Sequence, residues 1–191
     1  FPHRVKPSVR PPAHPRIPMK RRRRQPKPRP PAVHFVSLGC PKNLVDTELM
    51  SGQLGAAGYA IAADPEHADI LVVNTCGFIQ PACDEARTEI GRAVRWKKRR
   101  SRRRLVVAGC WVQRMGKEVL AEFPHIDLLL DLNAVPNILE LVHALRSGDT
   151  AGDPAVGLSG RRASALADDT VPRLLLSKPG CAYVKIAEGC N

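Results

Sequence analysis

Asp69-Ile-Leu-Val-Val-Asn74 decides the fold, because it is a short run of β-branched and aliphatic residues bounded by polar ones. Such a run is typical of a strand that is buried on both faces of a parallel sheet. His34-Phe-Val-Ser-Leu-Gly39 and Leu105-Val-Val-Ala108 have the same character, and Ile126 to Leu130 fits a fourth strand. We therefore expect several buried parallel strands distributed along the chain.

Helical patterns separate these strands. The clearest is an apolar i, i+3, i+4, i+7 stripe formed by Ile138, Leu141, Val142 and Leu145. Strands that alternate with helices predict an α/β fold, with an open, doubly wound, mainly parallel sheet and helices on both faces. The expected helices are Asn43 to Ala57, about Pro81 to Lys98, about Gln113 to Glu122, and a last one with Asn133 as its N-cap and Gly148 as its stop.

The composition divides the chain into four parts. Residues 1–32 hold 11 of the 30 Lys and Arg residues, 10 of the 18 prolines and no acid, so we expect a disordered tail with order beginning at Val33. Residues 33–148 form the main domain. Residues 149–180 are rich in Gly, Ala, Ser, Asp and Pro and predict a linker. Residues 181–191 are expected to start a further domain, with 182–187 as its first strand.

The charge is concentrated as well. The net charge is +12, but residues 1–32 and the run Arg92–Arg104 together hold 20 of the 30 basic residues. This distribution argues against a uniformly basic nucleic-acid-binding fold. No apolar run approaches the roughly 18 residues that span a bilayer, and no secretory signal is present, so we expect a cytoplasmic protein without membrane contact. In that compartment six cysteines favour metal or catalytic roles over disulfides.

Three of the cysteines share one context. Cys40, Cys76 and Cys110 each lie one or two residues past the end of an expected parallel strand. Because the carboxyl ends of parallel strands form one rim, where ligands bind, these three thiols are expected to converge. Three thiolates suit an iron–sulfur cluster that has one iron without a protein ligand. The alternative is that they are small buried core residues, the role expected for Cys83 and Cys181.

Four motifs resemble one known family. The radical-SAM methylthiotransferases have similar stretches, and the RimO-like branch, which modifies an aspartate of a ribosomal protein, is the most similar. The matching stretches are Val36-Ser-Leu-Gly-Cys-Pro-Lys-Asn-Leu-Val-Asp46, Val73-Asn-Thr-Cys-Gly-Phe-Ile79, Ala108-Gly-Cys110 with Gln113-Arg114, and Lys185-Ile-Ala-Glu-Gly-Cys190.

The resemblance implies that Cys40, Cys76 and Cys110 bind an auxiliary 4Fe–4S cluster. It also implies that Cys190 is the first ligand of a second 4Fe–4S cluster, which cleaves S-adenosylmethionine in a radical-SAM barrel. The remaining ligands of that second cluster are expected beyond this chain, which is then an N-terminal fragment that is inactive alone. The implied substrate is the β-carbon of an aspartate in the twelfth small-subunit ribosomal protein, and an electron donor is implied as well.

Two other functions stay open. The same chemistry could act on a tRNA adenosine, or the chain could be a truncated, non-catalytic cluster-binding module. The run Arg92–Arg104 likewise has two interpretations, a ribosomal RNA contact or a solvated helix end.

Overall fold

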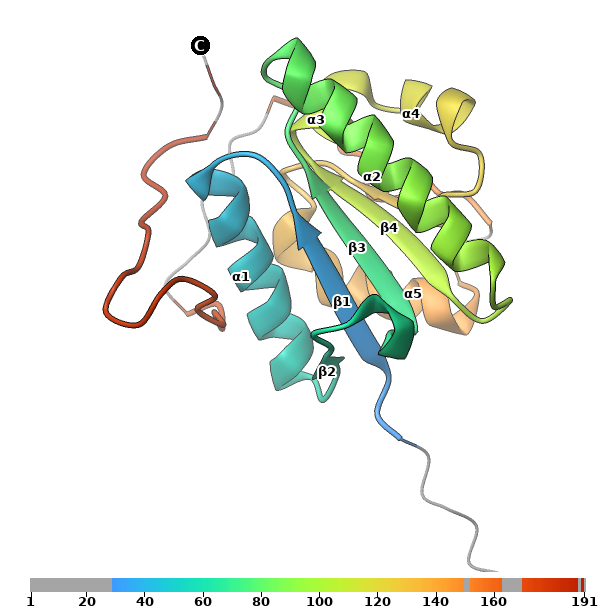
Figure 1. The fold of residues 1–191 in the computed structure, drawn as a ribbon, viewed down its shortest axis with the longest axis horizontal. Coiled ribbons are helices and arrows are strands. Elements are labelled where there is room, and N and C mark those ends of the chain that lie inside the picture. The colour runs from blue at the N-terminus through green and yellow to red at the C-terminus, as the bar shows by residue number, and fades with distance from the viewer. Residues whose placement is uncertain (1–28, 150–151, 163–169, 189, 191) are drawn as a thin grey trace, which may run out of the picture.

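The protein is built on one five-stranded parallel sheet (Figure 1), seen in a computed structural model that describes residues 29–149, 152–162, 170–188 and 190. The strand order is β2-β1-β3-β4-β5, and every pairing is parallel. This confirms the predicted fold class. The strands are β1 (Ala32–Ser37), β2 (Ala60–Ile61), β3 (Ile70–Thr75), β4 (Arg104–Gly109) and β5 (Leu128–Leu130).

Helices cover both faces of the sheet, so the fold is doubly wound. Side chains alternate along a strand, and in β3 Val72 packs with one apolar cluster while Val73 packs with the other. The first cluster joins α1 (Pro41–Ala56) and α5 (Ile138–Ser147) to the sheet. The second joins α2 (Gln80–Lys98), α3 (Cys110–Met115) and α4 (Glu118–Glu122).

Two helical predictions were wrong in detail. The helix expected over 113–122 is two short helices, because Gly116 adopts a positive φ of 57° that interrupts the helical path between them. Asn133 does not cap the last helix. A 3-10 turn at Val135–Asn137 precedes α5, and the Asn133 amide donates instead to the Ser159 hydroxyl at 3.0 Å. Gly148 ends α5 in the left-handed conformation, as predicted.

Ordered structure begins earlier than the expected Val33. Ala32 is already part of β1 and pairs with Ala60. The Asp69 carboxylate, just before β3, accepts a hydrogen bond from the Ala32 backbone N–H at 2.9 Å and pairs with Arg29 at 2.6 Å. The Asp69 carboxylate therefore fixes the beginning of β1 against the start of β3. The rest of the expected tail, residues 1–28, lies outside the described residues.

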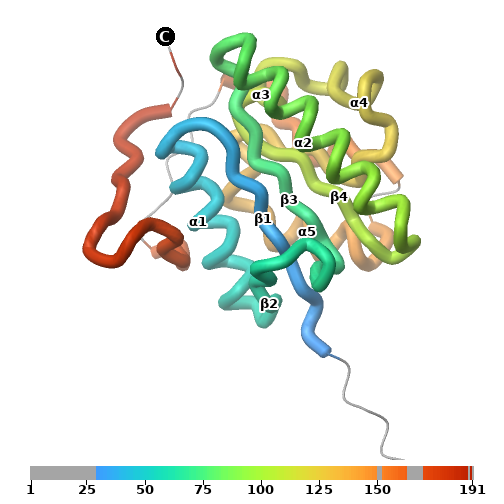
Figure 2. Tube along the Cα trace, in the orientation of Figure 1, coloured from blue at the N-terminus to red at the C-terminus, as the bar shows by residue number. Residues whose placement is uncertain are grey.

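Part of the predicted linker packs against the sheet. The Leu129 N–H donates to the Pro154 carbonyl at 2.7 Å, and the Asp131 N–H donates to the Gly157 carbonyl at 3.1 Å. Residues 154–157 therefore lie along the outer edge of β5 and are hydrogen-bonded to it. Farther on, residues 170–188 run beside α1, as the red part of the tube in Figure 2 shows.

The strand expected over 182–187 is not formed among the described residues. A strand is defined by backbone hydrogen bonds to a neighbouring strand, and no ladder to this stretch occurs in the part of the chain that the structure describes. No helix in the described ranges is both long and apolar enough to cross a bilayer.

Candidate functional site

The strand order brings the three strand-end cysteines to one edge of the sheet. Strands β1, β3 and β4 are immediate neighbours, and Thr75 at the end of β3 pairs with Gly109 at the end of β4. Cys40 precedes α1 as its N-cap residue, Cys76 follows β3 directly, and Cys110 is the first residue of α3. All three therefore lie at the carboxyl rim, where open α/β sheets bind ligands.

Two glycines allow this close approach. A Cβ on Gly39 would lie 2.5 Å from the Cβ of Cys76, and a Cβ on Gly109 would lie 2.4 Å from the side-chain oxygen of Asn74. Both glycines also have a positive φ, 86° for Gly39 and 101° for Gly109, which residues other than glycine rarely adopt. The backbone next to the thiols is therefore compact in a way that only glycine permits.

A buried asparagine connects the three strand ends. The Asn43 side chain, fully buried in the first turn of α1, donates from Nδ2 to the carbonyls of Leu38 and Thr75, both at 2.9 Å. Its Oδ1 accepts from the Cys110 thiol, with the sulfur 3.5 Å away. Asn74 in turn donates to the Asn43 carbonyl at 2.8 Å. These bonds fix the loops that carry the cysteines relative to one another.

Sequence reasoning missed both asparagines. Both lie inside the stretches that carry the family resemblance, but the sequence assigned them no role, because that role is visible only once three strands are placed side by side. One signal was available: Asn74 ends the apolar run of β3, where a buried polar side chain must find a partner. Its Oδ1 has no hydrogen-bond partner among the described residues, so one buried polar atom here remains unsatisfied.

The thiol of Cys110 is strongly perturbed. Burial raises its pKa to about 12, and the neighbouring Cys76, Cys190, Asp46 and Cys40 add to the shift by disfavouring a further negative charge. Four cysteines thus contribute to one electrostatic environment. Without a cation the thiol form is favoured, whereas a bound metal centre reverses this preference because it stabilises thiolate.

This pKa predicts slow alkylation of Cys110 in the metal-free chain. At pH 8 we expect its reaction with iodoacetamide to be roughly two to three orders of magnitude slower than that of the exposed Cys181. The rate should rise about tenfold per pH unit through pH 10, because only the thiolate reacts. Peptide mass spectrometry after timed quenching measures both rates. Equal rates for Cys110 and Cys181 at pH 8 would contradict the perturbation.

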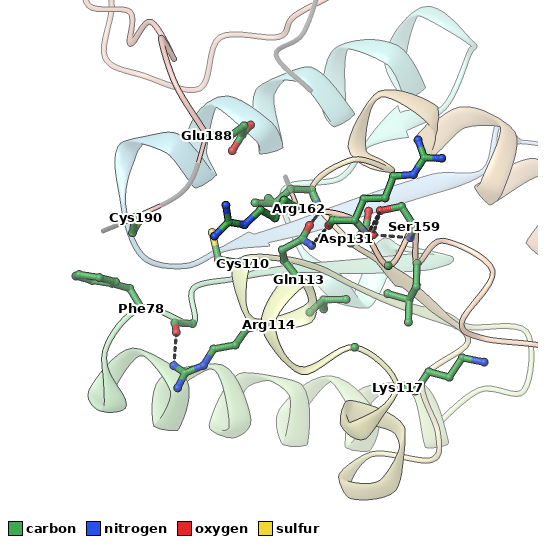
Figure 3. A pocket seen from close by; sticks show the side chains of 17 residues that line it. Phe78, Cys110, Gln113, Arg114, Lys117, Asp131, Ser159, Arg162, Glu188 and Cys190 are labelled. Atoms are coloured by element: carbon green, nitrogen blue, oxygen red, sulfur yellow. Dashed lines mark hydrogen bonds between the residues drawn. The ribbon is translucent and has the colours of Figure 1, made fainter. Parts of the chain in front are cut away.

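An open cleft of about 1100 Å³ borders the cysteine edge (Figure 3). Cys110 and Cys190 both line it. Cations dominate the charged lining, which also holds two acids, Asp131 and Glu188. The basic residues that line it are Arg114, Lys117, Arg161 and Arg162. The cleft therefore combines thiols with positive charge, which suits a ligand or substrate that carries negative charge.

Three of the predicted site cysteines, Cys40, Cys76 and Cys190, lie close enough to Cys110 to affect its pKa, and the other two cysteines of the chain do not. Cys83 belongs to α2 and its side chain packs in the core between this helix and the sheet. Cys181 is exposed and precedes the residues Glu188 and Cys190 that line the cleft. Within the described ranges, no three Cys, His, Asp or Glu side chains are arranged to hold a single metal ion. The donor set itself is all sulfur, and thiolates are the ligands that iron–sulfur clusters prefer. The residues present fit such a cluster.

The basic run lies at the opposite edge of the sheet. It covers the end of α2 and the loop into β4, whereas the cysteines follow the carboxyl ends of the strands. Several of its charges are used internally. Arg103 is only 2% exposed, stacks over Trp96 at 4.4 Å and pairs with Glu66 at 2.9 Å, and Lys97 pairs with Asp127 at 2.7 Å. The run is therefore partly structural.

The region that carries the sheet and its three cysteines matches a known family. The family model described as "Uncharacterized protein family UPF0004" matches residues 32–131, just over half of the chain. The chain belongs to this family. The UPF0004 match begins with β1 and ends directly after β5, so it contains Cys40, Cys76 and Cys110.

Curated relatives add a functional name. The chain is 47% identical over 160 residues to the protein of Syntrophus aciditrophicus (strain SB) named ribosomal protein uS12 methylthiotransferase RimO, covering 84% of this chain and 35% of that relative. Proteins of the same name match from Sorangium cellulosum (strain So ce56), 46% identical over 83% of this chain and 31% of the relative, and from Solibacter usitatus (strain Ellin6076), 40% over 83% and 32%. These names confirm the resemblance drawn from the motifs. The chain spans about a third of the length of these relatives.

Proposed function

We propose that this chain is the N-terminal part of a methylthiotransferase that modifies ribosomal protein uS12. The observation that carries the proposal is the convergence of Cys40, Cys76 and Cys110 at one rim, within a region that matches relatives of that name. In this reaction a methylthio group replaces a hydrogen on the β-carbon of an aspartate. Because the substrate is a ribosomal protein, we place the enzyme in the cytoplasm.

Each site residue has a proposed part. Cys40, Cys76 and Cys110 would hold an auxiliary 4Fe–4S cluster, and Cys190 would be the first ligand of a second one. When bound, the two clusters together with S-adenosylmethionine and an external electron donor supply the radical and the sulfur for the transfer. The protein contributes placement: Asn43 orients the loops that carry the thiols, and the cationic cleft accepts an acidic segment of the substrate.

The substrate is tested in a strain that lacks the gene. We expect the peptide of uS12 that contains the target aspartate to lose the mass increment of a methylthio group, while methylthioadenosine in bulk tRNA stays unchanged. Mass spectrometry of both pools, with a complemented strain as control, measures this. Loss of the tRNA modification with unchanged uS12 would assign the chain to the tRNA-modifying enzymes. No change in either pool would favour a non-catalytic cluster-binding module.

A ribosomal RNA contact through Arg92–Arg104 belongs to the same proposal. It rests on the basic residues of this run that form no hydrogen bond with an acidic side chain among the described residues. Two of them, Lys98 and Arg102, are exposed. Replacing both by glutamine should weaken co-sedimentation with ribosomes at low salt, and raising the salt should remove the difference, because phosphate contacts release counterions. The matched control is Lys178→Gln, an exposed lysine outside both the run and the cleft. Equal co-sedimentation of all three chains would restrict the run to its structural role.

A further inference from the structure

Helix α1 carries two buried carboxylates whose partners lie far along the chain. Glu48 is completely buried, and its partner Arg173 follows 125 residues later. Asp46 is 3% exposed, and its partner Lys185 follows 139 residues later. An isolated buried carboxylate is strongly unfavourable, so both residues require the later segment to lie against the helix.

Glu48 is the more fully satisfied of the two. Its Oε2 accepts from the Arg173 guanidinium at 2.8 Å, and its Oε1 accepts from the backbone N–H of Leu176 at 2.7 Å and from the Ser177 hydroxyl at 3.0 Å. Its backbone carbonyl also accepts from the Leu174 N–H at 3.0 Å. Burial alone would raise the pKa of Glu48, but these donors outweigh it and hold the pKa below its usual range.

Asp46 provides a second attachment of the later segment to α1, nearer to the end of the helix that follows Cys40. The Lys185 ammonium lies 2.6 Å from the Asp46 carboxylate and also pairs with Glu188. Burial by itself would lower the pKa of Lys185, but the carboxylates of Asp46 and Glu188 together outweigh burial and raise it. Burial also raises the pKa of Asp46 in spite of the neighbouring ammonium, so it is the 2.6 Å contact, and not the ionisation of either group, that attaches Lys185 to α1.

A glycine in the helix provides a third contact, because it has no side chain to keep another backbone away. Gly52 lies inside α1, and a Cβ there would come within 2.2 Å of the Pro172 carbonyl oxygen. The backbone of the later segment therefore rests directly on the helix at this residue. By contrast, a Cβ on Gly55 would meet nothing within 4 Å.

The three contacts follow one direction. Positions 52, 48 and 46 approach the N-terminal end of α1, while their partners advance from 172 through 173–177 to 185. The segment therefore runs antiparallel to α1 and reaches the helix end that begins after Cys40. Five residues beyond Lys185, Cys190 lines the same cleft as Cys110.

We propose that Gly52, Glu48 and Asp46 are positioning residues that dock residues 172–188 along α1 and thereby place Cys190 beside Cys110. The docking follows from the contacts above. Its purpose rests on the proposed function: it sets the spacing between the auxiliary cluster ligands and the first ligand of the second cluster.

The sharpest test is a matched pair of glycine substitutions in the metal-free chain. Gly52→Ala and Gly55→Ala both improve helix propensity, but only the first places a methyl group against the docked backbone. Two readouts apply: hydrogen exchange of the amides of Leu174, Leu176 and Ser177, and the yield of dibromobimane cross-links between Cys110 and Cys190 identified by peptide mass spectrometry.

We expect Gly52→Ala to lower the cross-link yield roughly tenfold and to speed exchange of those amides by a similar factor, whereas Gly55→Ala changes neither. Glu48→Gln should show the same loss, and Lys178→Met, an exposed change in the same segment, should not. Protection of the β3 and β4 amides shows that each variant is folded. Indistinguishable cross-linking and exchange for the two glycine variants would overturn the docking.

Iron binding by the same variants separates this inference from the proposed function. If Gly52→Ala displaces Cys190 but the unmodified chain binds no iron, the docking stands and the proposed cluster function fails. If the chain binds iron and Gly52→Ala leaves the cross-link unchanged, the docking fails and the cluster assignment stands.

Discussion

Replacing Cys76 by alanine is expected to abolish iron–sulfur cluster binding by this chain. After anaerobic reconstitution, the unmodified chain should hold about four iron atoms and four sulfides, the content of one 4Fe–4S cluster. Cys76 follows the central strand β3 and lies between the strand ends that carry Cys40 and Cys110. With only two thiolates left at the rim, the cluster loses one of its three protein ligands, so iron content should fall to background.

Iron and sulfide assays together with visible absorption measure this directly. Cys40→Ala and Cys110→Ala should give the same loss. The matched control is Cys83→Ala, which removes an equally buried thiol from the core beneath α2 and should leave the cluster intact. A cluster that survives loss of Cys76, or disappears with Cys83→Ala in a folded chain, would contradict the ligand assignment.

The convergence of the cysteines could be predicted from sequence because it depends on topology alone. Three buried runs, each followed by a cysteine, must end on one side of a parallel sheet, whatever the side-chain details. The same reasoning found β3 and α5, whose apolar patterns are long and regular. Strand β2 was missed because two residues carry no periodic pattern.

What sequence could not provide were contacts between distant segments. Gly116 interrupts a helix by its backbone conformation, and Asp69 fixes the start of β1 across a gap of 37 residues. Glu48 has the pattern of a solvated helical acid until Arg173 is placed beside it. For Asp69 and Glu48 the deciding partner is remote, so local propensity is overridden by tertiary structure, whereas Gly116 acts locally through its own positive φ. The packing of part of the predicted linker depends on a remote contact too, since Gly157 joins the sheet edge only after β5 is in place.

Helix α1 makes several of the contacts that position the site. Helix α1 begins directly after Cys40, inserts Asn43 between the strand ends and presents Asp46 and Glu48 to the returning chain. One helix thereby relates all four predicted site cysteines to one another. Substitutions along α1 should consequently affect the site even where no ligand is changed, and Asn43 offers the most direct case.

Replacing Asn43 by alanine should destabilise the fold by about 2–4 kcal/mol, because the buried carbonyls of Leu38 and Thr75 each lose a donor, and an unsatisfied buried group costs about 1–3 kcal/mol. Urea unfolding of the metal-free chain measures this. The control on the same helix is Gln53→Ala, whose amide makes one long contact of 3.5 Å to the Val135 carbonyl and should cost less than about 1 kcal/mol.

The same variant should separate stability from placement at the site. In the metal-free chain Asn43 also accepts from the Cys110 thiol. In the cluster-bound chain, where Cys110 is a thiolate with no proton to donate, Asn43 still fixes the β1 and β3 loops through the Leu38 and Thr75 carbonyls. In conditions where Asn43→Ala remains folded, we expect its reconstituted cluster to lose iron to a chelator faster than that of Gln53→Ala. Equal unfolding midpoints for the two variants would refute the structural role of Asn43. Equal rates of iron loss would show that the strand ends hold the thiols in place without it.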